Sequence, residues 1–208
     1  MAQYFSVHPT NPQPRLLKQA AGLLQQGGVL AVPTDSSYSL VCHLDDKAAV
    51  DNLRRIRKLD DKQLLTLICR DLSELSSYAR VDNAQFRLLK LGTPGPFTFV
   101  LEASKEVPRR VSHPQRKTIG LRVPDHKALL DLIELHGAPL LATTLILPGE
   151  ESPLNDPEMI RDQLEQQIAG VIDAGACPLE PTTVIDLTSS TPEILRQGRG
   201  DPADLGLT

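Results

Sequence analysis

A short segment of the chain combines three hydroxyl side chains with a carboxylate, a set that can bind a polar ligand. Val29 to Val32 is an unbroken apolar run that predicts a strand buried on both faces, and Pro33 ends it. Thr34, Asp35, Ser36 and Ser37 follow directly. Ligands of α/β proteins often bind where strands leave the sheet. The same residue types are also common in ordinary turns, so both interpretations remain open on pattern alone.

Cationic side chains are clustered in a chain whose formal net charge is -4. The groups are Arg54, Arg55, Arg57 and Lys58; Arg109, Arg110, Arg116, Lys117 and Arg122; and Arg196 and Arg199. Guanidinium groups pair bidentately with phosphate oxygens, so converging arginines would suit a phosphate-bearing ligand. Solvated surface is the alternative, and we favour it for Arg54, Arg55, Arg109 and Arg110. Arg57 differs because it lies on the flank of an apolar helical stripe, from which it could reach into a cleft.

Other catalytic and targeting signals are absent from the sequence. There is no phosphate-binding GxxxxGK[ST] loop, GxGxxG, HExxH or GxSxG motif. The five histidines are scattered and the three cysteines have no CxxC spacing, so we expect neither a metal site nor a disulfide framework. No segment approaches the ~20 apolar residues of a membrane span, and no signal peptide opens the chain. We therefore expect a cytoplasmic protein that does not interact with membranes.

Helical and strand patterns alternate along the chain, which predicts a layered α/β sheet in one domain, residues 1–208. Asn11-Pro12 is expected to begin the first helix, Asp45 or Asp46 the second, and Asp125 a later one. In the second helix Arg54 and Lys58 are expected to face water. Five helices are predicted, near residues 12–26, 46–58, 82–92, 125–137 and 156–168. Strand patterns are found within residues 29–32, 64–69, 97–101, 118–123, 139–147, 171–172, 183–187 and 193–195.

Several ordered segments resemble one family, the YrdC/YciO-type proteins. PTDSSYSL at Pro33 to Leu40 is similar to the family's first motif, and TPGPFT at Thr93 to Thr98 to its Pro-Gly-Pro-x-Thr turn. IGLRVP, PTTVIDLT and ILRQG, which begin at Ile119, Pro181 and Ile194, resemble three further motifs. RKTIGLRVP and CRDLSELSSYARVDNAQFRL look particularly like the YciO branch. The resemblance spans nearly the whole chain.

The resemblance implies a YrdC/RibB-like fold, in which helices flank a large twisted mixed sheet with a concave ligand cleft. The best-characterised members make threonylcarbamoyl-AMP from threonine, bicarbonate and ATP, as the first step of threonylcarbamoyladenosine formation in tRNA. By this resemblance ATP is the expected substrate, Mg²⁺ a candidate accompanying ion, and Arg57, Thr34 and Thr144 the candidate catalytic residues. The candidate substrate- and nucleotide-binding residues are Thr34, Asp35, Ser36, Arg57, Thr98, Arg122, Thr144, Thr182, Thr183 and Arg196.

Three departures from the family pattern bear on activity. The family's Lys-x-Arg pair corresponds here to Arg57 and Leu59, so one cation is missing. The asparagine of its Ser-Ala-Asn segment corresponds to Ile146, and the glycine that ends the first motif to Val41. Loss of one charged donor from a site commonly slows a reaction strongly, because each 1.36 kcal/mol is tenfold in rate. We therefore expect weak or altered synthase activity.

The sequence leaves three functions open. The first is a threonylcarbamoyl-AMP synthase-like nucleotidyltransferase. The second is a protein that binds double-stranded RNA or tRNA through the same basic cleft without turnover, in which case Arg109, Arg110, Arg116 and Lys117 would contact phosphates. The third is a related carbamoyl or nucleotidyl transferase with a different substrate.

Overall fold

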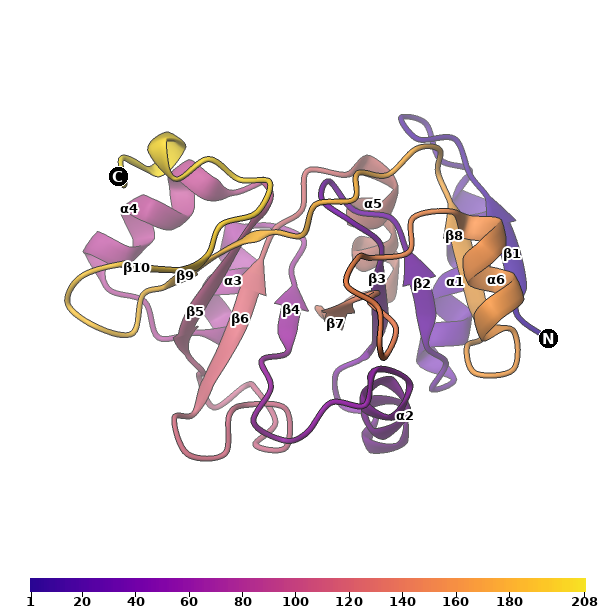
Figure 1. Cartoon of the computed structure of the whole chain (residues 1–208), viewed down its shortest axis with the longest axis horizontal. Coiled ribbons are helices and arrows are strands. Elements are labelled where there is room, and N and C mark those ends of the chain that lie inside the picture. The colour runs from indigo at the N-terminus through magenta and orange to yellow at the C-terminus, as the bar shows by residue number, and fades with distance from the viewer.

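Ten strands form one mixed sheet in the computed structural model, which describes residues 1–208 (Figure 1). The strand order is β1-β8-β2-β3-β7-β4-β6-β5-β9-β10. Four neighbouring pairs are parallel, namely β1/β8, β2/β8, β4/β6 and β5/β9, and the other five are antiparallel. The expected architecture of a large mixed sheet flanked by helices is therefore confirmed.

The elements alternate along the chain as the sequence pattern predicts. The strands are β1 Gln3–Ser6, β2 Leu30–Val32, β3 Ser39–His43, β4 Thr66–Ile68, β5 Phe97–Glu102, β6 Thr118–Arg122, β7 Leu140–Thr144, β8 Gly170–Asp173, β9 Thr183–Asp186 and β10 Glu193–Arg196. The helices are α1 Pro14–Gln25, α2 Lys47–Arg57, α3 Leu72–Tyr78, α4 Asn83–Gly92, α5 Lys127–His136 and α6 Pro157–Leu164, followed by a 3₁₀ turn, Pro202–Leu205. No helix among them combines the length and the apolar character needed to cross a membrane.

The two faces of the sheet are covered by two apolar clusters. Successive side chains of a strand point to opposite faces, so Leu67 lies in the larger cluster and its neighbour Ile68 in the smaller one. Helices α1 and α5 lie side by side and cover the smaller cluster, which includes Leu24 and Leu132 (Figure 1). Helices α2, α4 and α6 contribute Leu53, Leu89 and Ile160 to the larger cluster, and α3 contributes Leu75.

Several helices begin or end at residues that suit a cap, and the expected start of the second helix near Asp46 is confirmed. Asp46 accepts from the backbone N–H of Ala49 at the start of α2, and Asp156 caps α6 in the same way. Asp82 and Gln85 form the reciprocal capping box that opens α4. Gly137 ends α5 in the left-handed conformation.

Other expectations about the elements are wrong. Helix α1 begins at Pro14 rather than Pro12, and α5 is capped by the imidazole of His126 rather than by Asp125. The sequence reading also misses β1, β3 and α3. Helix α3 spans only seven residues and only Leu75 of it is buried, so the spacing of Leu72, Leu75 and Tyr78 is too short a pattern to predict a helix.

Arg54 was expected to face water, but it is buried. Its Nη1 donates to the Asp60 carbonyl at 2.8 Å and its Nη2 to the Arg110 carbonyl at 3.4 Å. Arg54 therefore joins the segment after α2 to the β5–β6 loop. Its guanidinium satisfies backbone acceptors that apolar neighbours would leave unpaired.

Candidate functional site

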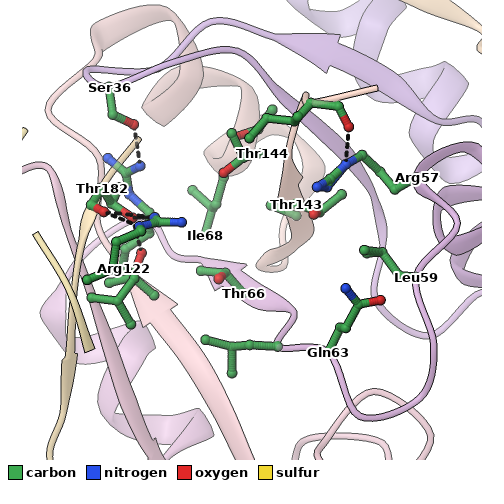
Figure 2. Close-up of a pocket in the computed structure, with 17 residues that line it drawn as sticks. Ser36, Arg57, Leu59, Gln63, Thr66, Ile68, Arg122, Thr143, Thr144 and Thr182 are labelled. Carbon is green, nitrogen blue, oxygen red and sulfur yellow. Dashed lines mark hydrogen bonds between the residues drawn. The ribbon is translucent and has the colours of Figure 1, made fainter. Parts of the chain in front are cut away.

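The middle of the sheet carries a cavity of about 290 Å³, whose floor is one face of adjacent strands (Figure 2). Paired residues place Ser39 beside Thr144, Ala142 beside Thr66, and Ile68 beside Arg122. Ile68 and Ala142 also belong to the cluster under α1 and α5, so the cavity lies on the same face, where that helical cover ends. Its lining residues are Ser36, Ser39, Arg57, Leu59, Gln63, Leu64, Thr66, Ile68, Thr98, Arg122, Ala142, Thr143, Thr144, Ile146, Thr182, Val184 and Arg196.

The turn after β2 contributes one side chain to this lining and uses the others to hold its own shape. Thr34 Oγ1 donates to the Ser37 carbonyl at 2.7 Å and accepts from the Ser36 backbone N–H at 3.0 Å. It also lies 2.9 Å from Ser36 Oγ, and Ser36 is the residue of this turn that reaches the cavity. Thr34 therefore positions Ser36 and is not itself part of the lining.

Arg122 is held by a buried ion pair beneath the turn. Its Nη2 donates to the carboxylate of Asp35 and its Nη1 to Ser36 Oγ at 3.1 Å. The second Asp35 oxygen accepts from the Asp125 backbone N–H at 2.9 Å. Burial lowers the pKa of Arg122, whereas the Asp35 carboxylate raises it. Asp35 thus lies outside the lining but fixes the cation that borders the cavity.

A hydroxyl pair and a second arginine extend the same end of the cavity. Thr98 Oγ1 lies 2.8 Å from Thr182 Oγ1. Arg196 donates to the Thr182 carbonyl at 2.8 and 3.1 Å and to its hydroxyl at 3.2 Å. Thr183 faces away, since its Oγ1 donates to the Gly200 carbonyl at 2.5 Å and accepts from Gly198 N–H at 2.9 Å. Thr183 therefore anchors the C-terminal segment and does not line the cavity.

Arg57 lies at the opposite end, across Thr66 and Ile68 from Arg122 (Figure 2). Its Nε donates to the Ile146 carbonyl at 2.6 Å, while its Nη1 is buried without a partner. Loss of water around the guanidinium lowers the pKa of Arg57. Leu59 and Ile146, the two apolar residues at expected donor positions, both line the cavity beside it. Seven of the ten predicted binding residues thus share one cavity, the exceptions being Thr34, Asp35 and Thr183.

Sequence reasoning missed Ser39, Gln63, Thr66 and Thr143, which also line the cavity. Thr66 is enclosed in an apolar strand and Thr143 in another, so neither stood out as a ligand-binding residue. The pairing of β4, β7 and β3 brings them together. The basic residues expected to bind RNA are elsewhere, because Arg109, Arg110, Arg116 and Lys117 are not among the lining residues.

The lining has a one-sided charge. It contains three arginines and seven hydroxyl side chains, Ser36, Ser39, Thr66, Thr98, Thr143, Thr144 and Thr182, but neither Asp nor Glu. Such a cavity attracts anions and offers hydroxyls to phosphate, ribose or carboxylate oxygens. Hard divalent cations prefer carboxylate ligands, so these residues do not fit a resident Mg²⁺. An ion that entered with a nucleotide would be carried by the nucleotide's own phosphates.

Comparison with known proteins places this geometry in a family. The family model of the Sua5, YciO and YrdC proteins, described as telomere recombination, matches residues 22–198. YciO of Escherichia coli K12 is 51% identical over 201 residues, 97% of this chain and 98% of YciO. The human threonylcarbamoyl-AMP synthase is 33% identical over 180 residues, 83% of this chain and 63% of that protein.

Solved structures show the same relationship. The crystal structure of E. coli YciO matches with a TM-score of 0.95 at 50% identity, covering 99% of this chain and 100% of that one. P. abyssi Sua5 complexed with L-threonine matches with a TM-score of 0.86 at 27% identity, covering 94% of this chain and 57% of that one. The sequence motifs, the mixed sheet and these matches agree, and the chain belongs to the Sua5/YciO/YrdC family.

Proposed function

We propose that this protein binds ATP in the cavity and acts as a slow threonylcarbamoyl-AMP synthase-like enzyme. The observation that carries the proposal is the acid-free cavity itself, which is lined by three arginines and seven Ser or Thr residues. The relatives named threonylcarbamoyl-AMP synthase support it, as does the Sua5 structure that contains L-threonine. A role in tRNA modification would follow if the product is passed on to tRNA.

The proposed reaction needs a site that binds anions at every stage. The threonine amine bonds to the carbon of bicarbonate with loss of water, which yields a carbamate anion. A carbamate oxygen then bonds to the α-phosphorus of ATP, the bond to the bridging oxygen breaks, and its electron pair leaves on pyrophosphate. Arg122 and Arg196, with Ser36, Thr98 and Thr182, are suited to the phosphates because fixed donors stabilise charge that develops there. Arg57 supplies the cation at the other end.

The absence of acidic side chains also suits the nucleophile. An amine attacks only in its neutral form, and neighbouring cations favour loss of the ammonium proton. Arg57 and Arg196 line the cavity without a carboxylate partner, and the Asp35 carboxylate lies outside the lining, where it is already paired with Arg122. The same charges attract the bicarbonate and the carbamate. The lining thus favours both the reactive amine and the anion it becomes.

Pyrophosphate release from ATP that depends on threonine and bicarbonate tests the proposed function. We expect measurable release in the wild type and a faster rate in the Leu59→Arg/Ile146→Asn double variant, because both positions line the cavity and gain hydrogen-bond donors. A gain of tenfold corresponds to about 1.4 kcal/mol of transition-state stabilisation. Lack of threonine-dependent release in both proteins would rule the synthase function out.

RNA binding is a second candidate, and one loop favours it. Residues 104–117 between β5 and β6 carry five Lys or Arg side chains, Lys105, Arg109, Arg110, Arg116 and Lys117, against one acidic residue, Glu106. Some of them surround a separate surface depression, together with Arg80 and Glu102. The phosphate backbone of RNA would suit such a loop. Its binding would then weaken as the salt concentration rises, because binding releases counterions from the phosphates.

A salt series of duplex RNA binding tests this candidate. We expect the slope of log affinity against log salt to become shallower when Arg109, Arg110, Arg116 and Lys117 are changed to Ala, because fewer phosphates are neutralised. Changing Arg57 to Ala, within the cavity, is the matched comparison and should leave the slope unaltered. An equal slope in wild type and the fourfold variant would exclude this loop as the RNA-binding surface.

A further inference from the structure

The two ends of the cavity differ in what surrounds their cations. Arg122 donates to Asp35 and to the Ser36 hydroxyl, and Arg196 to the carbonyl and hydroxyl of Thr182, although Arg122 Nε is buried without a partner. Arg57 instead has Leu59 beside it, together with Gln63 and Thr143 (Figure 2), and Leu64 and Ile146 also line the cavity. The cavity therefore has one end with two arginines among hydroxyls, and a more apolar end in which a single arginine adjoins both apolar and polar residues.

Arg57 retains an unused donor at this apolar end. Its Nε is bonded to the Ile146 carbonyl, and its buried Nη1 has no partner. The lining supplies no carboxylate to pair with it. A buried guanidinium N–H group destabilises the protein unless it donates a hydrogen bond to an acceptor. A planar carboxylate matches the geometry of the guanidinium donors. The missing acceptor is therefore best supplied by a ligand.

The apolar neighbours restrict what else that ligand carries. A phosphate group is strongly hydrated and would have to lose water against Leu59 and Ile146. A carboxylate attached to a branched alkyl group instead places its charge on Arg57 and its methyl groups on the two apolar side chains. Neither Leu59 nor Ile146 can hydrogen-bond a substrate hydroxyl through its side chain. Leu59 and Ile146 therefore do not favour the hydroxyl group of threonine over the second methyl group of valine.

We propose that the Arg57 end of the cavity is a subsite for an amino acid with a branched apolar side chain, such as valine, with its carboxylate on Arg57 and its side chain on Leu59 and Ile146. This inference rests on the proposed function for the identity of the reaction but not for the existence of the subsite. Valine and threonine have nearly the same shape, so a comparison of their affinities measures the effect of replacing a methyl group by a hydroxyl group.

Calorimetry with valine and threonine tests the subsite, in the presence of a non-hydrolysable ATP analogue with a methylene bridge between the α- and β-phosphates. We expect the wild type to bind valine at least as tightly as threonine. Ile146→Asn should shift the ratio of the two Kd values about tenfold toward threonine, because its amide can hydrogen-bond the hydroxyl. Arg57→Gln should weaken both amino acids about tenfold or more, since it removes the charge. Leu91→Asn, at an exposed leucine of α4, is the matched control and should leave the ratio unchanged.

The outcomes separate this inference from the proposed function. Tenfold preference for threonine in the wild type, or no binding of either amino acid, overturns the subsite, and neither result depends on a variant that has to fold. A Kd ratio that does not change in Ile146→Asn overturns it as well. Pyrophosphate release is measured in parallel with both amino acids and ATP. If valine binds but neither amino acid causes pyrophosphate release, the subsite stands and the synthase function is refuted. If threonine causes pyrophosphate release and valine does not, the synthase function stands and the subsite is refuted.

Discussion

The arginines of the cavity are distinguished by their partners rather than by their charge. Arg122 is neutralised by Asp35 and is almost fully buried, so its first role is to join β6 to the turn after β2. Arg196 donates to neutral acceptors of Thr182 and keeps its full charge at the cavity. Burial lowers the pKa of Arg196 without approaching neutrality, because guanidinium groups stay protonated in proteins. Arg196 is therefore the better isolated probe of phosphate binding.

Replacing Arg196 by Ala is expected to weaken ATP binding by about 1–3 kcal/mol, the usual scale of a hydrogen bond to a charged group. Calorimetric titration with ATP measures this effect. Arg87→Ala removes an exposed arginine of α4 and should leave the affinity unchanged. Equal ATP affinity in the wild type and Arg196→Ala would show that Arg196 only supports Thr182.

Gly120 of strand β6 creates space in the cavity without supplying a functional group of its own. Gly120 pairs with Thr66 of β4 on one side and with Val100 of β5 on the other. A Cβ atom at Gly120 would lie 2.8 Å from Thr66 Oγ1 and 3.0 Å from Thr98 Cγ2, two residues of the cavity floor. The missing side chain thus leaves the floor open between the Arg57 and Arg122 ends.

Gly120→Ala is expected to reduce nucleotide and amino acid affinity about tenfold, because the added methyl group displaces both threonines or enters the cavity. Titration with ATP and thermal unfolding should be measured together. Gly22→Ala is the matched control, since a Cβ there meets nothing within 4 Å and alanine is the better helix former. Unaltered ligand binding by a folded Gly120→Ala protein would contradict the role given to this glycine.

At the scale of the whole molecule, a histidine pair outside the cavity lining connects two elements. His43, at the end of β3, lies 2.9 Å through Nδ1 from Nε2 of His136, at the end of α5. The Nδ1 of His136 is buried without a partner. Burial, reinforced by His43, lowers the pKa of His136 from 6.5 to about 4. Between these two pH values His136 is therefore neutral in the folded protein and protonated in the unfolded chain.

The stability of the protein should consequently fall with acid between about pH 6.5 and pH 4. Above this window His136 is neutral in both states, and below 6.5 the unfolded chain binds the proton first. We expect His136 to account for a loss of about 1–2 kcal/mol in the free energy of unfolding. The free energies of unfolding of the wild type and His136→Gln, measured with urea at several pH values, isolate the contribution of His136, because both proteins have the same carboxylates. Parallel pH profiles for the two proteins would refute the assignment.

The sequence alone determined most classes of element and the family, and it predicted several residues that line the cavity. Apolar periodicity and caps such as Asp46, Asp82 and Asp156 depend on local geometry, so they can be recognised without tertiary structure. Motif order was enough to select Ser36, Thr98, Arg122, Thr182 and Arg196 before their positions were known. Leu59 and Ile146 were likewise identified as departures, and the fold places both at the cavity.

Only the tertiary structure decided which side chains serve the cavity and which serve the fold. Thr34 and Thr183 have the same chemistry as Ser36 and Thr182, but backbone partners turn them away from the cavity. Arg54 and Arg57 share one helix, and only the chain packed around them makes one a structural tie and the other a cavity residue. Thr66 and Thr143 reach the floor through strand pairings that bring together residues distant in sequence. Hydrogen-bond partners of this kind are set by long-range contacts, which local sequence patterns do not encode.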